Sequence, residues 1–311
     1  MSPVVTKLLR TASSPAPTAS RPDAMLKPAR DSHSTWQTLR RFVRIPSAGV
    51  GALVLLVLML AAALAPLLTP YESDVIAPLD AYEPPSLDHL MGTDKFGRDV
   101  FTRVLFGGRI SLMVGFAATV LGGGIGLLLG MLASFFTGLI DEIIMRLIDI
   151  MLAFPDILLS MGIVALLGPS VQNVIIAVGL SYVAGFARCV RGCVLSVKAQ
   201  DHILAAQALG CRPRVIMWRH ILPNIVAPLI VYGTLSIASA ILAAAGLSFL
   251  GLGAQPPTPE WGVMLSDGRE TLNRAWWVSL FPGLAILVTT LSINFVGDGL
   301  RTALDPRVRG R

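Results

Sequence analysis

The chain has 311 residues, of which 54% are hydrophobic and 14% are charged, and its formal net charge is +6. A soluble domain of this length needs more charged side chains to cover its surface, so the composition argues against one. The basic residues are spread along the chain and not gathered in one stretch. A nucleic-acid partner is therefore not expected.

The first 48 residues differ in composition from the rest of the chain. They include the stretch TASSPAPTAS, which is rich in Ser, Thr, Ala and Pro and has no apolar period. Residues 1–48 are therefore predicted to form a disordered tail. The first 30 residues contain no apolar core. We therefore expect no cleaved signal peptide, and the first spanning helix is expected to act as the anchor.

Six apolar blocks follow the tail. A helix needs roughly 20 apolar residues to cross a bilayer, and backbone polar groups in hydrocarbon must be paired within the segment. The sequence therefore predicts an all-α polytopic membrane protein, with a transmembrane domain over residues 49–311. The six predicted spans are about 50–68, 110–136, 147–167, 171–187, 221–252 and 275–296.

Lys and Arg are distributed unequally between the segments that join these spans. Of the 25 basic residues, 19 fall in 1–48, 137–146, 188–220 and 297–311, and six fall in 69–109 and 253–274. An excess of Lys and Arg marks the cytoplasmic side of a membrane protein. Both termini and the segment 188–220 are therefore predicted to lie in the cytoplasm.

The stretch GTDKFGRDVFTR precedes the second span on the predicted outer side. Asp94 is four residues before Arg98, and Asp99 is four before Arg103, so each acid can pair with its base on a short helix. An interfacial helix that frames the outer mouth is the favoured interpretation, and contact with an outer protein is the alternative. Trp261 lies in the Pro-rich stretch AQPPTPEWG, also on the predicted outer side, and Trp suits the membrane interface. An ordered outer loop is the favoured interpretation of this stretch, and contact with an outer protein is the alternative.

Asp149 and Asp156 are the only acids inside a predicted span. Ionisable groups within a membrane usually face the protein interior or a cavity. Arg146 lies one turn before Asp149 and is predicted to pair with it. Asp156 follows Pro155, which is expected to bend the helix. Asp156 can line a translocation path or form a hydrogen bond to a neighbouring helix, and both possibilities remain open.

The polar stretch DHILAAQALGCRPRVIMWRHILPN lies between the fourth and fifth spans. Asp201 is predicted to be the N-cap of a short helix that ends at Gly210 in the left-handed conformation. Pro213 suits the first turn of a second helix, which is predicted to reach about His220. Pro223 marks the entry into the fifth span. The loop is thus predicted to be helix, break, helix.

Two interpretations fit this loop. Ala205 and Ala206 give its first helix a small face that suits insertion into a groove on a partner protein. Alternatively, the loop lies on the inner leaflet, where Arg212, Arg214 and Arg219 contact phosphates of membrane lipids.

Several stretches resemble one family. The stretch AAQALG is followed nine residues later by HILPN. This pattern resembles the cytoplasmic loop motif of ABC-importer permeases. MGTDKFGRDVFTRVLFGGRISL, MRLIDIMLAFPDILLS, GLSFLGLGAQPPTPEWGVML and GDGLRTALDPRVR are similar to the C-type permeases of dipeptide, oligopeptide and nickel importers. These blocks lie in order between residues 91 and 309.

The resemblance implies that the loop is a coupling helix that fits a cleft on an ATPase subunit. Ala205, Ala206, Gly210 and Pro223 match the motif, whereas Leu204 stands where the family usually has Glu. The implied partners are a second permease, two P-loop ATPases and an extracytoplasmic solute-binding protein in a bacterial inner membrane. The implied cargo is a dipeptide, an oligopeptide, nickel or a related small solute such as glutathione.

The chain has no G-x-x-x-x-G-K-[ST] pattern, so ATP and Mg are expected only on the partner subunits. No catalytic residue is predicted. No metal site is predicted either, because Cys189, Cys193 and Cys211 lack further ligands at metal-binding spacing. The alternative function is an ion-coupled secondary transporter that uses Asp149 and Asp156.

Overall fold

The computed structural model describes residues 42–136 and 138–304. These residues form helices and connecting loops without a β-strand, which confirms the predicted all-α class. Most of the predicted tail, residues 1–41, lies outside the described residues. Within the described residues, the helix Pro46–Ala63 begins inside the segment that was predicted to be tail.

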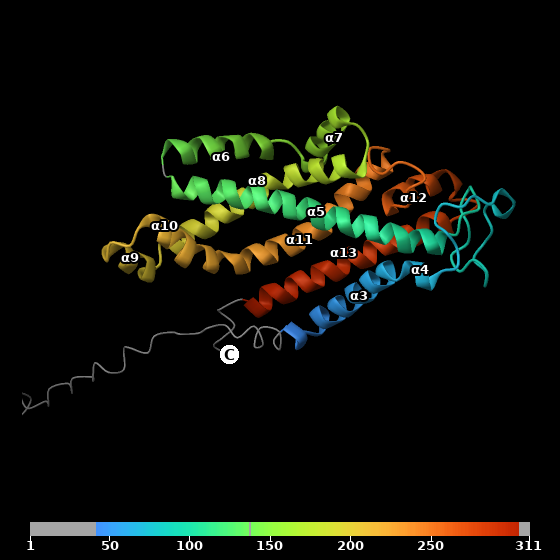
Figure 1. Cartoon of the computed structure of the whole chain (residues 1–311), viewed down its shortest axis with the longest axis horizontal. Coiled ribbons are helices and arrows are strands. Elements are labelled where there is room, and N and C mark those ends of the chain that lie inside the picture. Colours follow the sequence, from blue (N-terminus) through green and yellow to red (C-terminus); the bar gives the residue numbers. More distant parts are fainter. Residues whose placement is uncertain (1–41, 137, 305–311) are drawn as a thin grey trace, which may run out of the picture. The chain divides into compact units, whose positions relative to one another are not determined.

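Most of the helices follow one another with short connections, whereas the long loop 69–99 joins α4 to α5 (Figure 1). The α-helices are α3 (Pro46–Ala63), α4 (Ala65–Leu68), α5 (Val100–Phe135), α6 (Leu139–Leu152), α7 (Asp156–Leu167), α8 (Val171–Lys198), α9 (Asp201–Ala208), α10 (Pro213–Val215), α11 (Leu222–Phe249), α12 (Trp261–Gly268) and α13 (Trp277–Leu304). A π-helical turn, Ile216–Ile221, joins α10 to α11. Short 3₁₀ turns lie at Pro78–Asp80 and Arg269–Thr271.

Five helices are long and apolar enough to cross a membrane, namely α3, α5, α8, α11 with its preceding turns, and α13. The third predicted span, 147–167, is divided at the expected bend, since α6 and α7 meet at an angle of 91°. Pro155 lies in the break, where it has no N–H to donate and disfavours a helical conformation in the residue before it.

Other spans are longer than their apolar blocks. Helix α5 begins ten residues before the predicted start at residue 110, and α8 and α13 continue to Lys198 and Leu304. A helix does not end where its side chains become polar, because its backbone hydrogen bonds continue until a cap or a breaker intervenes.

A row of glycines on α5 brings that helix against α8. Gly122, Gly126 and Gly130 are spaced by four residues, so they lie on one face. A Cβ added at Gly126 would lie 2.4 Å from the Phe186 Cβ, and one added at Gly122 would lie 2.5 Å from the Gly179 carbonyl oxygen. The two backbones are therefore close enough to exclude any side chain, as in small-residue interfaces of membrane helices.

Replacing Gly126 by Val is expected to lower the free energy of unfolding by about 2 kcal/mol, because the new side chain forces α5 and α8 apart. Gly124→Val on the same helix is the control, since a Cβ there meets no atom within 4 Å. Denaturation of the two purified variants in the same detergent measures the difference. Equal losses would show that helix propensity, and not packing, is responsible.

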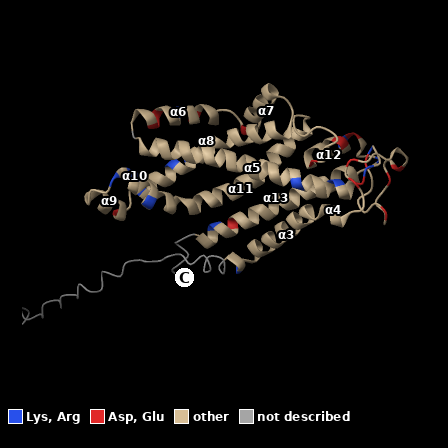
Figure 2. Cartoon of the chain, in the orientation of Figure 1, with Lys and Arg blue, Asp and Glu red and all other residues tan. Residues whose placement is uncertain are grey.

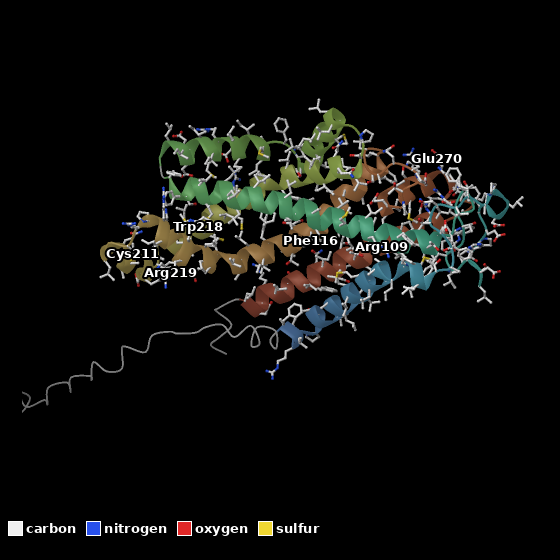
Figure 3. All side chains as sticks on the ribbon, viewed as in Figure 1. Arg109, Phe116, Cys211, Trp218, Arg219 and Glu270 are labelled. Carbon is white, nitrogen blue, oxygen red and sulfur yellow. The ribbon has the colours of Figure 1, made fainter. Side chains whose placement is uncertain are left out.

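Charged residues are concentrated toward the two ends of the helical bundle (Figure 2). The segment from α9 to the π-helical turn forms one end, and the loop 69–99 with α12 forms the other (Figure 1). Figure 3 labels Cys211, Trp218 and Arg219 at the first end and Glu270 at the second. The long helices between the ends are almost free of charge, as a hydrocarbon environment requires.

Candidate functional site

The candidate site is the segment 201–223, called here the hairpin. Helix α9 ends where Gly210 adopts a φ of +78°, which confirms the predicted left-handed stop. The Cys211 N–H donates to the Ala206 carbonyl over 3.1 Å, and the Gly210 N–H donates to the Gln207 carbonyl over 2.9 Å. These two bonds form a Schellman motif, which satisfies the last carbonyls of the helix.

One face of α9 is buried and the opposite face is exposed. Ile203 is fully buried in a cluster with Val190, Val194, Val197, Ile216, Met217, Ile221 and Ile225. Asp201, Ala205 and Ala208 lie roughly opposite Ile203 at 100° per residue, and all three are exposed. Ala206 is half-buried, so Ala205 is the more accessible residue of the Ala pair. Leu204 is 50% exposed at the side of this face.

Two details of the predicted hairpin were wrong. Asp201 is the first helical residue and not the N-cap; Gln200 holds the cap position without a side-chain hydrogen bond. The second helix does not end near His220, since α10, the π-helical turn and α11 follow one another without a break. Pro223 is the second residue of α11, directly after the π-helical turn, and it has no N–H to donate back into that turn. The hairpin therefore passes directly into a spanning helix.

The predicted outer-face residues form a buried charged cluster at the other end of the bundle. Arg98 Nε donates to Asp94 Oδ2 over 2.7 Å, which confirms this pair, although the residues lie in a turn and not on a helix. Arg98 Nη2 also lies 3.8 Å from Asp267, which pairs with Lys95 at 2.7 Å. The cluster thereby attaches the loop before α5 to α12.

The predicted pair of Asp99 with Arg103 was wrong. Asp99 is the N-cap of α5, and its side chain accepts from the Thr102 N–H over 2.7 Å and pairs with His89 Nδ1 at 2.9 Å. Arg103 instead lies 3.7 Å from Asp94 and donates to the Ser73 carbonyl over 2.8 Å. The side chains of Asp94, Arg98, Asp99 and Arg103 are almost fully buried. Their burial favours a structural role in framing this end of the bundle and disfavours direct contact with an outer protein.

Trp261 is also buried, with 3% of its surface exposed. Its Nε1 donates to the Val104 carbonyl over 2.9 Å, and its ring packs on Gly107 and Gly108 of α5. The role of the neighbouring Glu260 was not predicted from the sequence. It caps α12 by accepting from the Val263 N–H over 3.0 Å. Glu is not among the residues preferred at an N-cap, so the local sequence carried no clear signal for this role.

The two aspartates of the third span have different surroundings. Asp149 pairs with Arg188 of α8 and not with Arg146, which lies 3.8 Å from Glu142. A second pair, Asp141 with Arg191 at 2.7 Å, parallels the first. Both arginines lie on α8 beyond the predicted end of the fourth span at residue 187.

Asp156 is the first residue of α7 and is exposed, and no ion pair of the described residues involves it. A hollow of about 520 Å³ near the N-terminal parts of α5 and α8 is lined by other residues, including Gln172 and Gln255. Within residues 42–136 and 138–304, no three His, Cys, Asp or Glu side chains are placed to hold a metal ion.

Comparisons with known proteins find two matching family models. One, described as a binding-protein-dependent transport system inner membrane component, matches residues 123–310. The other, described as the N-terminal TM domain of oligopeptide transport permease C, matches residues 34–85. Together the two matched ranges include the hairpin, the first span and helix α12, to which the charged cluster attaches.

Individual relatives match over most of their length. The dipeptide transport system permease protein DppC of Alkalihalophilus pseudofirmus is 45% identical over 277 residues, covering 89% of this chain and 91% of that protein. The glutathione transport system permease protein GsiD of Escherichia coli is 45% identical over 279 residues, covering 89% and 91%.

A solved structure shares the fold. A chain of the inward-facing MetNI methionine ABC transporter has a TM-score of 0.56 at 18% identity, covering 65% of this chain and 97% of that chain.

Proposed function

The chain belongs to the family of binding-protein-dependent transport system inner membrane components, and we propose that partner ATPases drive it by docking on the hairpin. It is a non-catalytic, multi-pass permease subunit of an ABC importer of the dipeptide and oligopeptide subfamily. This membership decides against the alternative of an ion-coupled transporter that works alone. The hairpin is the part through which hydrolysis in separate subunits can reach this chain.

The observation that carries the proposal is the division of α9 into two faces. Ile203 fixes the helix from one side, and the small residues Ala205 and Ala208 leave the other side without bulky side chains. A helix held in this way can fit a groove on a partner, with its backbone close to the groove wall. Leu204, in place of the usual Glu, presents an apolar contact at the edge of that face.

The hairpin is built to transmit a displacement. The cluster around Ile203 includes residues of α8, the π-helical turn and α11, so α9 cannot move without them. Lys198 adds a further link, since its Nζ donates to the Ser134 carbonyl near the end of α5. Because packed clusters move as units, pressure on α9 tilts α8 and α11 together, as alternating access requires.

The two interpretations of the loop apply to different halves of it. Helix α9 contains no Lys or Arg, whereas Arg212, Arg214 and Arg219 all follow Gly210. The first half therefore suits a protein groove, and the second half suits a phosphate-bearing surface. In this proposal the hairpin and both termini lie in the cytoplasm, which the distribution of Lys and Arg supports.

The full assembly in this proposal contains a second permease, two P-loop ATPases carrying ATP and Mg, and an extracytoplasmic solute-binding protein. The cargo is a short peptide, in line with the dipeptide and glutathione permeases that are 45% identical. Asp149 is neutralised by Arg188, so it is poorly suited to bind a coupling ion. Asp156 is exposed at the break between α6 and α7 and is the better candidate to line the path.

A photo-crosslinking amino acid at Ala205 tests the docking. In cells, we expect it to capture a protein that mass spectrometry identifies as a P-loop ATPase, because Ala205 faces outward from α9. The same amino acid at Leu166, which is 89% exposed on α7, is the control and should not capture the ATPase. Cross-links from Ala205 to lipid alone, or equal capture from both sites, would contradict the proposal.

A further inference from the structure

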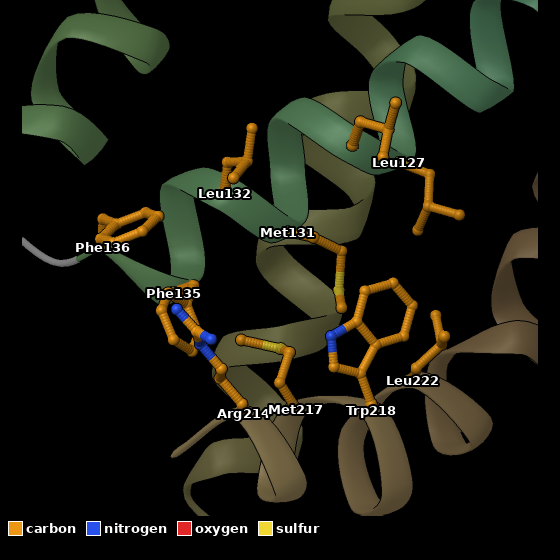
Figure 4. A pocket seen from close by; sticks show the side chains of 10 residues that line it. Leu127, Met131, Leu132, Phe135, Phe136, Arg214, Met217, Trp218 and Leu222 are labelled. Atoms are coloured by element: carbon orange, nitrogen blue, oxygen red, sulfur yellow. The ribbon is translucent and has the colours of Figure 1, made fainter.

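An apolar pocket lies between the end of α5 and the base of the hairpin. Its volume is about 240 Å³, and nine of the ten residues that line it are apolar. Figure 4 shows Arg214, Met217 and Trp218 extending toward α5, and Met131 extending from α5 toward the Trp218 ring. The pocket is separate from the exposed face of α9.

Helix α5 supplies the wall of this pocket in two rows. Leu127, Met131 and Phe135 are half-buried and pack against the cluster around Ile203, so they form the floor. Leu128, Leu132 and Phe136 form the rim and are 61%, 44% and 44% exposed. Each row repeats every four residues, which places its members along one line of the helix. A linear apolar groove of this kind suits an extended hydrocarbon chain.

The π-helical turn supplies the opposite wall. It contains Met217, which is 4% exposed, next to Trp218, which is 65% exposed. A π-helical turn widens the helix locally and is frequent at functional sites. An exposed Trp beside a hydrocarbon-lined groove is typical of the membrane–water interface.

The charges at the mouth point to the occupant. Arg214 lines the pocket, whereas Arg212 and Arg219 belong to the same segment but do not line it. None of the three takes part in an ion pair within the described ranges 42–136 and 138–304, whereas Arg188 and Arg191 of α8 are both paired with aspartates. The pocket therefore presents uncompensated positive charge next to an apolar groove.

We propose that this pocket binds an anionic phospholipid, with one acyl chain in the groove and the phosphate on the Arg214 guanidinium. Basic pockets beside spanning helices recognise such headgroups. The α5 wall contains no charged residue from Ile110 to Phe136, so it offers apolar contacts that suit an acyl chain and no charged contact for a water-soluble subunit. A second permease is disfavoured, because the same side of such a subunit is also rich in Lys and Arg.

Quenching of Trp218 fluorescence by brominated lipids tests this site. The complete purified transporter is placed in vesicles of phosphatidylcholine and phosphatidylglycerol, with bromine on the acyl chains of one lipid at a time. The difference in fluorescence between the wild type and Trp218→Phe gives the contribution of Trp218 alone, without that of the other tryptophans. We expect brominated phosphatidylglycerol to quench this signal more strongly than an equal fraction of brominated phosphatidylcholine.

Arg214→Gln is expected to lower the preference for phosphatidylglycerol about fivefold. Arg219→Gln is the matched control, because it removes the same charge from the same segment but does not line the pocket. Native mass spectrometry of retained phosphatidylglycerol gives a second reading that does not depend on the tryptophan, and it is compared between wild type and the two Arg variants.

Four results would overturn the proposal. Equal quenching by both lipids would mark an ordinary bilayer-facing surface, and equal effects of the two Arg variants would mark a diffuse basic patch. A Trp218 signal that no lipid quenches in the assembled transporter would mean that a partner subunit covers the pocket. Loss of the preference in millimolar inorganic phosphate would assign the site to a free anion without an acyl chain.

Discussion

Ala205→Arg is expected to lower peptide uptake at least roughly thirtyfold, while the permease remains folded in the membrane. The residue lies opposite the buried Ile203, so an added guanidinium extends toward the docked subunit and not into the core. A central interface position of this kind contributes about 2 kcal/mol or more, which corresponds to that factor. Uptake of labelled peptide by cells, with the amount of membrane-bound permease measured in parallel, checks the result.

Gln207→Arg is the control for this prediction. Gln207 is exposed on the same helix but lies about 160° around it from Ala205, so the same charge is added away from the proposed docking face. Uptake should remain close to that of the wild type. If both variants transport normally, ATPases do not dock on this face; if both fail equally, the added charge acts through the helix as a whole.

Local signals in the sequence predicted local structure well. Gly210, followed by Pro213, indicated a helix stop and then a new first turn, and the structure has both. Such signals succeed because the φ of Gly and the missing N–H of Pro act within a few residues. The spans were located for a similar reason, since apolar blocks must be helical in hydrocarbon.

Spacing rules failed where their premise did not hold. The pairing of Asp99 with Arg103 assumed that both side chains lie along a helix, but the helix begins at Val100, and the Asp99 carboxylate caps it by accepting from the Thr102 N–H. The pairing of Asp149 with Arg146 failed because Arg188, 39 residues away, is a nearer partner. Only the packing of α6 on α8 brings these residues together, and one sequence does not reveal that packing.

The docking face itself was only partly predictable. The Ala205–Ala206 pair was recognised as small, but the sequence did not reveal which of the two faces outward. That choice depends on Ile203, which is buried by residues of α8 and α11 that are distant in the sequence. The pocket beside the hairpin was not predicted at all, because it requires the end of α5 to meet a π-helical turn.

Asp94→Ala is expected to lower the free energy of unfolding by about 3–5 kcal/mol, the largest stability effect that we predict. The Asp94 carboxylate accepts from Arg98 Nε over 2.7 Å and from the Phe96 and Arg98 N–H groups over 2.8 and 3.0 Å. Its loss leaves Arg98 and Arg103, which are 4% and 2% exposed, without their nearest buried negative charge. Denaturation of the purified protein in detergent measures the change.

Glu142→Ala provides the contrast. Glu142 also pairs with an Arg four residues later, Arg146, but the two side chains are 70% and 72% exposed and 3.8 Å apart. Its removal should cost less than about 1 kcal/mol, because water already solvates both charges. The loss in the free energy of unfolding for Asp94→Asn should fall between these two values. Its amide oxygen still accepts backbone hydrogen bonds but does not compensate the charge of the guanidinium groups. Equal losses for Asp94→Ala and Glu142→Ala would mean that burial contributes nothing to the strength of the charged cluster.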